Sequence, residues 1–408
     1  MKIVGSIALD ASLTVQQKAE QVASSLRSMP DRGADEAVQA VLSGAETVPH
    51  FAANYLAVLP GHLAEKQAVV DTLLRDEPTK LESVTNLIRF LSPSTVDELV
   101  RCCLDKPPPG AEGLITEAAE FFPHVVRPYA DRITDEYAQS SLWPGAPEEW
   151  VTEALDMWRE TGDIAAIERL GLARTDFARA ALLAHRSSFL PDDLELVDTF
   201  IENAGIFPES KDPSVYPSTL LGLISDREGS PHHIGAGFAS PVPACPMCDE
   251  PAVRVLTLAR DALPFPVAGV ADPSFFWFPC DCDMMHYVYA QFTDDGVEGV
   301  MTEVVMPDDS LDWLPGELAL DLMVHPNQYG PGIDAEPGLS HYHQVGGYPP
   351  WIQADRFPRC TVCGNGMRFL ASIDSGITIF GDMSFEGILY GFWCEQCSVS
   401  VMHIQQGE

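Results

Sequence analysis

Residues 360–397 read CTVCGNGMRFLASIDSGITIFGDMSFEGILYGFWCEQC, so a CxxC pair stands at each end of a stretch rich in strand-forming residues. A CxxC turn places two thiols on one side of a tight loop, which suits two corners of a tetrahedral zinc site with Zn–S bonds of about 2.3 Å. Two such turns that face one another complete the site. The stretch therefore predicts a zinc ribbon with the ligands Cys360, Cys363, Cys394 and Cys397.

The same order of parts occurs earlier in the chain. The CxxC at Cys245 and Cys248 is followed, at a nearly equal distance, by a CxC at Cys280 and Cys282. Because the CxC turn is tighter, His286 is a reserve ligand for this first site. Strand-like segments lie within each interval and after each second pair, which indicates two zinc-ribbon-like modules. The modules cover residues 245–292 and 341–408, and strands are expected at 253–258, 275–278, 286–292, 367–373, 388–393 and 399–404.

Residues next to the cysteines support two structural zinc ions. Gly364 directly follows Cys363, where a positive φ lets backbone N–H groups point at the sulfurs, and Asp249 is the poorer equivalent in the first module. A redox CxxC would open a helix, whereas a β-branched run follows Cys397. Four thiolates also leave no open position for a catalytic water.

The N-terminus bears on the compartment. Residues 1–9 contain only a short apolar run before Asp10, which is a poor signal peptide. We therefore expect a cytoplasmic protein with zinc-bound thiolates rather than disulfides. Cys102 and Cys103 lie in a helical pattern and are expected to be small buried side chains.

A distinctive stretch between the two modules, residues 341–355, reads HYHQVGGYPPWIQAD. The glycines allow a tight turn, and the prolines impose an extended segment. Trp351 then either offers a face to a partner or fills the seam between the ribbons. His325, His341 and His343 lack ligand spacing and are expected to be ordinary loop histidines. The expected partner surface consists of Gly346, Gly347, Pro349, Trp351 and Gln353.

The pattern GGxPxWxQ, followed by CxxC, MxFL, an aromatic strand and a second CxxC, resembles the YwqG-like bacterial family of uncharacterised function. It is also similar to the zinc-binding halves of the programmed-cell-death-protein-2 family. The resemblance covers at most roughly residues 230–408. The resemblance to the eukaryotic family implies a dedicated chaperone for a ribosomal protein. The resemblance to the bacterial family implies a protein whose gene travels with toxin and immunity genes. It rests on Gly346, Gly347, Pro349, Trp351, Gln353, Cys360, Cys363, Met367, Phe369, Leu370, Cys394 and Cys397.

The first half of the chain reads as helix after helix. An apolar stripe runs from Leu81 to Leu91, Ser92 and Pro93 form a helix start, and a second stripe leads to Cys103. We predict an α+β chain with an all-α array, solenoid-like or an irregular bundle, over 1–205. A linker over 206–244 would join it to the β-rich domain over 245–408. Further helices are expected near 114–122, 147–161, 163–170 and 176–184.

The net charge of −36 would repel a nucleic-acid backbone and suits a basic protein partner, such as a ribosomal protein or a cationic toxin. Solubility alone is the other explanation of the charge. No run is long enough for a membrane helix. Because no HExxH, GxSxG or phosphate loop occurs, hydrolase and nucleotide-dependent classes lose support. We expect a non-catalytic adaptor, escort or inhibitor. The alternatives are a redox- or zinc-responsive switch and an enzyme of an unrecognised class.

Overall fold

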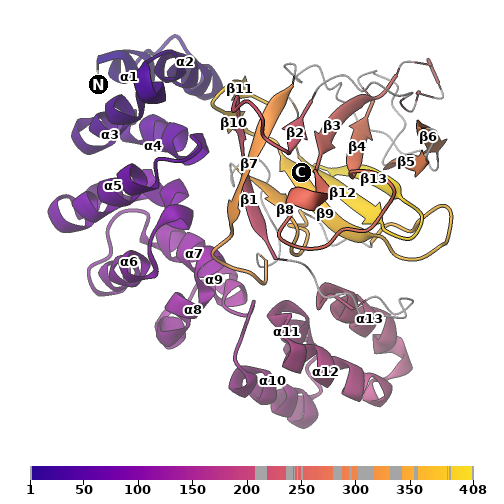
Figure 1. The fold of residues 1–408 in the computed structure, drawn as a ribbon. Coiled ribbons are helices and arrows are strands. Elements are labelled where there is room, and N and C mark those ends of the chain that lie inside the picture. The colour runs from indigo at the N-terminus through magenta and orange to yellow at the C-terminus, as the bar shows by residue number, and fades with distance from the viewer. Residues whose placement is uncertain are drawn as a thin grey trace.

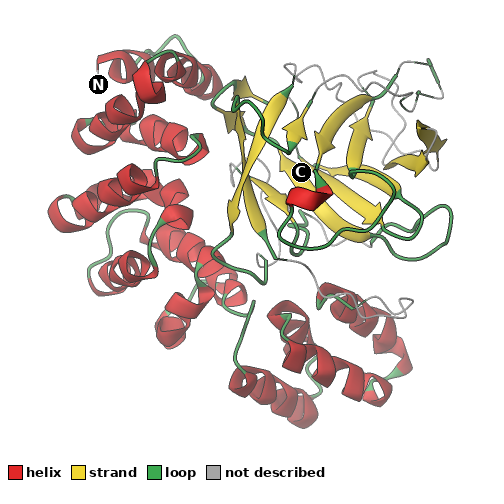
Figure 2. Cartoon of the chain, in the orientation of Figure 1, coloured by secondary structure: helices red, strands yellow, loops and turns green. Residues whose placement is uncertain are grey.

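The computed structural model describes residues 2–206, 218–235, 242, 244–245, 247–249, 251–278, 287–293, 296–301, 317–330, 342–352, 357–383, 385 and 387–406. A helical N-terminal half precedes an antiparallel β half, which confirms the predicted α+β class (Figure 2). Helices α1 to α9 follow one another in an arc along one side of the sheet, and α10 to α13 form a group at its end (Figure 1). The inner side of the arc is therefore covered by the protein's own β half.

The helices are α1 (Lys2–Ala8), α2 (Val15–Arg27), η1 (Pro30–Gly33), α3 (Ala34–Ser43), α4 (Val48–Val58), α5 (Leu63–Asp76), η2 (Pro78–Phe90), α6 (Pro93–Asp105), α7 (Ala111–Phe121), α8 (Pro123–Val126), η3 (Arg127–Arg132), α9 (Glu136–Ser141), α10 (Glu148–Thr161), α11 (Ala165–Ala173), α12 (Asp176–His185), η4 (Arg186–Ser188), η5 (Pro191–Asp193), α13 (Leu194–Asn203) and η6 (Arg260–Ala262).

Local sequence signals explain several helix starts. The Ser92 hydroxyl accepts a hydrogen bond from the Thr95 amide at the start of α6, and Thr175 caps α12 in the same way. The stripe from Leu81 to Leu91 is buried as predicted, but it forms the 3₁₀ run η2 instead of an α-helix. A stripe of apolar residues shows which face is buried and does not decide between these two helix types.

The strands are β1 (Leu220–Ser225), β2 (His233–Ile234), β3 (Val253–Thr257), β4 (Ser274–Trp277), β5 (Tyr287–Thr293), β6 (Gly296–Met301), β7 (Leu318–Val324), β8 (His343–Val345), β9 (Arg368–Asp374), β10 (Ile377–Thr378), β11 (Gly381–Asp382), β12 (Ile388–Cys394) and β13 (Val399–Gln405).

The β half is duplicated, and the duplication starts earlier than the sequence suggests. Its main sheet has the order β4-β3-β2-β7-β1-β8-β9-β12-β13-β5-β6 over the described residues. One series runs β1, β2, CxxC, β3, β4, β5, and the other runs β7, β8, CxxC, β9, β12, β13. The segment expected to be a linker, 206–244, thus contains two strands of the sheet. Because β1 pairs with both β7 and β8, and β7 pairs with β2, each half contributes strands to the other.

A bulge repeats at the same place in both halves. Pairing of β3 with β4 skips from Arg254 to Leu256, and pairing of β9 with β12 skips from Phe369 to Ala371. The residues passed over, Val255 and Leu370, are both buried. A bulge adds twist to a strand. Its recurrence in both series shows that the repeat includes the geometry of the strands as well as their order.

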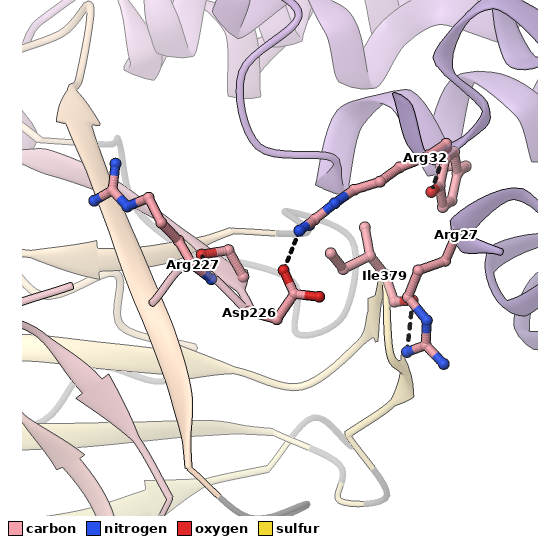
Figure 3. A network of polar contacts seen from close by, with 7 residues as sticks. Arg27, Arg32, Asp226, Arg227 and Ile379 are labelled. Carbon is pink, nitrogen blue, oxygen red and sulfur yellow. Dashed lines mark hydrogen bonds and ion pairs between the residues drawn. The ribbon is translucent and has the colours of Figure 1, made fainter. Parts of the chain in front are cut away.

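A hairpin of the β half inserts into the N-terminal helices. In the sequence, β10 and β11 come between β9 and β12, and they form a separate two-stranded hairpin. Ile379 at its turn is fully buried in the core that the helices form. Figure 3 shows the polar contacts around it: Arg27 Nη1 donates to the Ile379 carbonyl at 3.3 Å, and Arg32 forms an ion pair with Asp226. The hairpin and these arginines fix the first helices against the sheet.

A cluster of polar side chains lies farther along the contact between the N-terminal helices and the β half. The Arg89 guanidinium is within 3.2 Å of Glu117 and lies over the Tyr342 ring. The Tyr342 hydroxyl donates to Glu120 at 3.4 Å, and burial, followed by the nearby Glu117, raises the pKa of Glu120 to about 8. Burial lowers the pKa of His325, which stacks on Phe121, to about 3. At neutral pH Glu120 therefore keeps its proton and His325 is uncharged, which limits the cost of enclosing these groups.

Candidate metal centre

The first knuckle of the second ribbon precedes β9. Gly364 has a φ of 73°, and its amide donates to the Cys360 carbonyl at 2.9 Å, which closes the turn around the two cysteines. The Val362 amide donates to the Cys360 sulfur at 3.4 Å. These are the features that the sequence predicts from a glycine after the second cysteine, because a positive φ turns backbone N–H groups toward the sulfurs.

The second knuckle connects β12 to β13. Cys394 is the last residue of β12, and β13 begins two residues after Cys397. The connecting residue, Ser398, has a φ of 53° and takes the place that Gly364 has in the first knuckle. Sequence reasoning missed Ser398, since a serine carries no signal for a left-handed conformation. The antiparallel pairing of β9 with β12 brings the two knuckles together at one end of the strands.

The four cysteines of this ribbon gather as predicted. Their sulfur atoms all lie within 4.8 Å of one another, and Cys363 Sγ is 3.7 Å from Cys394 Sγ. A tetrahedral zinc ion with bonds of about 2.3 Å requires sulfur separations of about 3.8 Å. A disulfide would require about 2.05 Å, and the four cysteines are free thiols. The donor set and its spacing therefore fit a four-thiolate zinc site.

The pKa values of the cysteine thiols show what four thiolates at this site would require. Burial is the main influence on Cys397, and it raises the pKa of that thiol to about 11. Burial also raises the pKa of Cys394 far above its usual value. Burial acts against ionisation of Cys363 too, but hydrogen bonds from the Asn365 amide and from the thiols of Cys397 and Cys394 outweigh it and lower the pKa. Without a bound cation the group cannot hold four thiolates at neutral pH.

The first module has one knuckle among the described residues, formed by Cys245 and Cys248. It has the same geometry as the Cys360–Cys363 knuckle of the second module. Asp249 has a φ of 62°, and its amide donates to the Cys245 carbonyl at 2.8 Å. Bridges join Ala244 to Pro251 and, at the matching positions, Arg359 to Gly366. The predicted positive φ of Asp249 is thus confirmed. Cys280, Cys282 and His286 lie outside the described residues, so a second zinc ion stays a prediction.

The expected partner stretch is buried in this structure. Gly346, Gly347, Pro349 and Trp351 are all buried, and Gln353 lies outside the described residues. The Trp351 ring packs on Tyr390 and Phe392, with ring centres 4.7 and 5.7 Å away. These contacts make Trp351 a buried packing residue, and the two rings both belong to β12 of the second module rather than to a seam between the two ribbons. Binding of a partner by this stretch stays a prediction.

Replacing Gly347 with alanine should destabilise the β half by about 3 kcal/mol. Gly347 has a φ of 71°, and a Cβ there would overlap the Thr219 hydroxyl and lie 2.9 Å from Thr219 Cβ. Gly229→Ala is the control, because Gly229 has a φ of 75° with open space around it and should lose only about 1 kcal/mol. Urea unfolding of both variants measures the difference. Equal losses would mean that Thr219 moves aside and that the close approach is not needed.

Within the part of the chain that the structure describes, the other histidines and cysteines form no further metal-binding group. His325 lies in a loop as expected, but the expectation of a loop histidine is wrong for His343, which is the first residue of β8. Both side chains are buried, and burial lowers the pKa of His343 to about 4, while His341 lies outside the described residues. Cys103 is buried in α6, as predicted, and Cys102 is half-buried. Among the described helices none has the length and apolar character that crossing a bilayer requires.

Comparison with known proteins gives one limited similarity. Over 168 residues the chain is 29% identical to a Salmonella typhimurium LT2 protein described as "Uncharacterized protein YpfL". The aligned region covers 40% of this chain and 39% of that protein. No family model and no solved structure matches the chain. The resemblance to the YwqG-like and programmed-cell-death-protein-2 families therefore stays a hypothesis, and the metal centre carries the argument about function.

Proposed function

We propose that this protein is a non-catalytic, cytoplasmic zinc protein that binds a basic protein as an adaptor, escort or inhibitor. The observation that carries the proposal is the closed four-cysteine group, in which Cys360 and Cys394 are buried and all four positions are taken by the protein. Such a site stabilises a fold and leaves no position for substrate. We further propose a second zinc ion in the first module, held by Cys245, Cys248, Cys280 and Cys282.

The charge of the chain supports a basic partner. The chain has 60 acidic residues and only 24 lysines and arginines, which gives the net charge of −36. Many of these cations already pair within the molecule, as Arg186 does with Asp198 and Arg227 with Asp321. An acidic surface accelerates association with a cationic protein and rejects acidic competitors, and both effects weaken with salt.

The test is to isolate the tagged protein from its own cells at moderate salt and to identify near-stoichiometric companions by mass spectrometry. We expect one basic protein. The affinity of the complex, rebuilt from purified components, should fall at least tenfold between roughly 0.05 and 0.5 M salt, because salt screens the attraction between the charges. Isolation of no companion, or a reconstituted complex whose affinity does not change with salt, would reject a charge-guided partner. The identity of the companion separates an escort of a ribosomal protein from an inhibitor of a toxin.

A zinc- or redox-responsive switch is the second candidate, because Cys363 and Cys397 are only partly buried. Oxidation of accessible zinc thiolates ejects the metal and loosens the ribbon. Mild peroxide should then release zinc and lower the unfolding midpoint, with recovery after thiol reduction and addition of zinc. Retention of zinc under peroxide would exclude the switch and leave the binding function as the proposal.

A further inference from the structure

The second knuckle of the metal centre is held from both sides by a loop of the other module. Trp393, just before Cys394, donates its indole N–H to the Ala268 carbonyl at 2.8 Å. Ser398, just after Cys397, accepts a hydrogen bond at its hydroxyl from the Val270 amide at 3.0 Å. The residues on either side of the CxxC turn are therefore tied to one surface loop, 268–270, which comes from the first half of the duplication.

The loop fits closely against these two residues. Gly269 has a φ of 147°, and a Cβ there would lie 2.7 Å from the Trp393 ring and 3.2 Å from the Ser398 hydroxyl. The loop is fixed in turn by Arg260, whose backbone amide donates to the Asp272 carboxylate at 3.0 Å and whose side chain donates to the Gly269 carbonyl. No side chain larger than hydrogen fits at Gly269 without movement of the tryptophan.

Ser398 shows why the knuckle needs outside support. Its φ of 53° is unfavourable for a residue with a Cβ, at a cost of roughly 1–2 kcal/mol. Such a conformation persists only where surrounding contacts fix it. Here the Val270 amide binds its side chain, and the Phe292 amide donates to its carbonyl at 2.8 Å. In the first knuckle, Gly364 adopts the same conformation without that cost.

We propose that loop 268–270 of the first module holds the Cys394–Cys397 knuckle in the geometry that zinc binding requires. The second module supplies all four ligands, and the first module positions two of them. Trp393 and Ser398 are the positioning residues. This inference rests on the proposed zinc site and adds how that site is controlled. By thermodynamic reciprocity, a loop that raises metal affinity is itself stabilised, by the same factor, when metal binds. Loss of zinc from the second module would therefore loosen the loop that leads into β4 of the first.

The experiment uses the full chain and two variants that remove one hydrogen bond each. Ser398→Gly keeps the left-handed backbone without strain and deletes the hydroxyl, while Trp393→Phe keeps an aromatic ring and deletes the indole N–H. Zinc dissociation constants are measured by competition with a chromophoric chelator. We expect each variant to bind zinc about tenfold more weakly or worse, as for partners of metal ligands elsewhere. Trp150→Phe in α10 is the matched control and should leave zinc affinity unchanged.

Two further readouts separate positioning from general loss of stability. Cobalt substituted for zinc gives a tetrahedral thiolate spectrum, which should shift or weaken in Ser398→Gly and not in Trp150→Phe. Hydrogen exchange at the Val270 amide should be slow in the zinc form of the natural protein, faster after chelation, and fast in Ser398→Gly with or without zinc. Equal unfolding midpoints of the metal-free proteins would place the effect in the metal-bound state.

The outcomes distinguish the two levels of the proposal. If the natural protein binds no zinc by elemental analysis, the zinc function itself is wrong, and this inference is rejected with it. If zinc binds tightly but both variants keep the natural dissociation constant and cobalt spectrum, the positioning role of the loop is wrong and the zinc site stands.

Discussion

Replacing Cys394 with serine is expected to lower the free energy of unfolding by about 5 kcal/mol and to remove zinc from the second module. Cys394 is buried at the end of β12 and belongs to the group whose sulfurs lie within 4.8 Å of one another. A serine hydroxyl stays protonated at neutral pH and is a poor ligand for zinc. The loss is that of the metal–sulfur bonds which fix the two knuckles to one another, since the three remaining cysteines take up protons once the cation is gone.

The measurement is urea unfolding at pH 7 with zinc present, accompanied by elemental analysis of the purified variant. Cys102→Ser is the matched control, since Cys102 is a half-buried thiol in α6 and should change stability by about 0.5 kcal/mol or less. A chelator should destabilise the natural protein by several kcal/mol more than the Cys394 variant, roughly, because the variant has already lost the zinc of the second module and can lose only the zinc proposed for the first. A chelator effect of equal size in both proteins would show that Cys394 is not a ligand.

The parts that sequence could predict are those whose chemistry is local. The strands β3, β4, β5, β9, β12 and β13 and the cysteine group follow from alternation, aromatic content and CxxC spacing within a few residues. Gly364 and Asp249 follow from the backbone conformation that a knuckle requires. Helix starts such as Ser92 and Pro93 follow from capping, which also depends on adjacent residues.

The parts that sequence could not predict depend on distant partners. β1 is a short run, fully buried because it pairs with β7 and β8, about a hundred residues away, and the glycines and prolines around it suggest a linker instead. Ile379 and Arg89 are buried only because one half of the chain packs on the other. Loop 268–270 carries no motif, and its role depends on Trp393 and Ser398 of the other module.

Replacing Trp351 with alanine is expected to cost about 4 kcal/mol of unfolding free energy, within the range for a large buried ring. Trp351 is 5% exposed, and it packs on Phe357, Tyr390 and Phe392 over one face of the sheet beside the metal ribbon. The Ile352 amide next to it donates to the Tyr390 hydroxyl at 3.2 Å, which fixes the segment where the ring enters. The cavity left by alanine closes only in part, because Tyr390 and Phe392 lie on β12, which is held in place by its pairing with β9 and β13.

Trp351→Phe is the control that isolates ring packing. The indole Nε1 of Trp351 is buried and has no hydrogen-bond partner among the described residues, so phenylalanine removes a donor that these residues leave unsatisfied while it keeps most of the contact. We expect that variant to lose about 1 kcal/mol or less by urea unfolding, because the smaller ring cavity is offset by the removed donor. A Trp351→Ala protein that unfolds at the natural midpoint yet no longer retains its partner would reverse the assignment. Trp351 would then be a contact residue, and the packing seen around it would open when the partner binds.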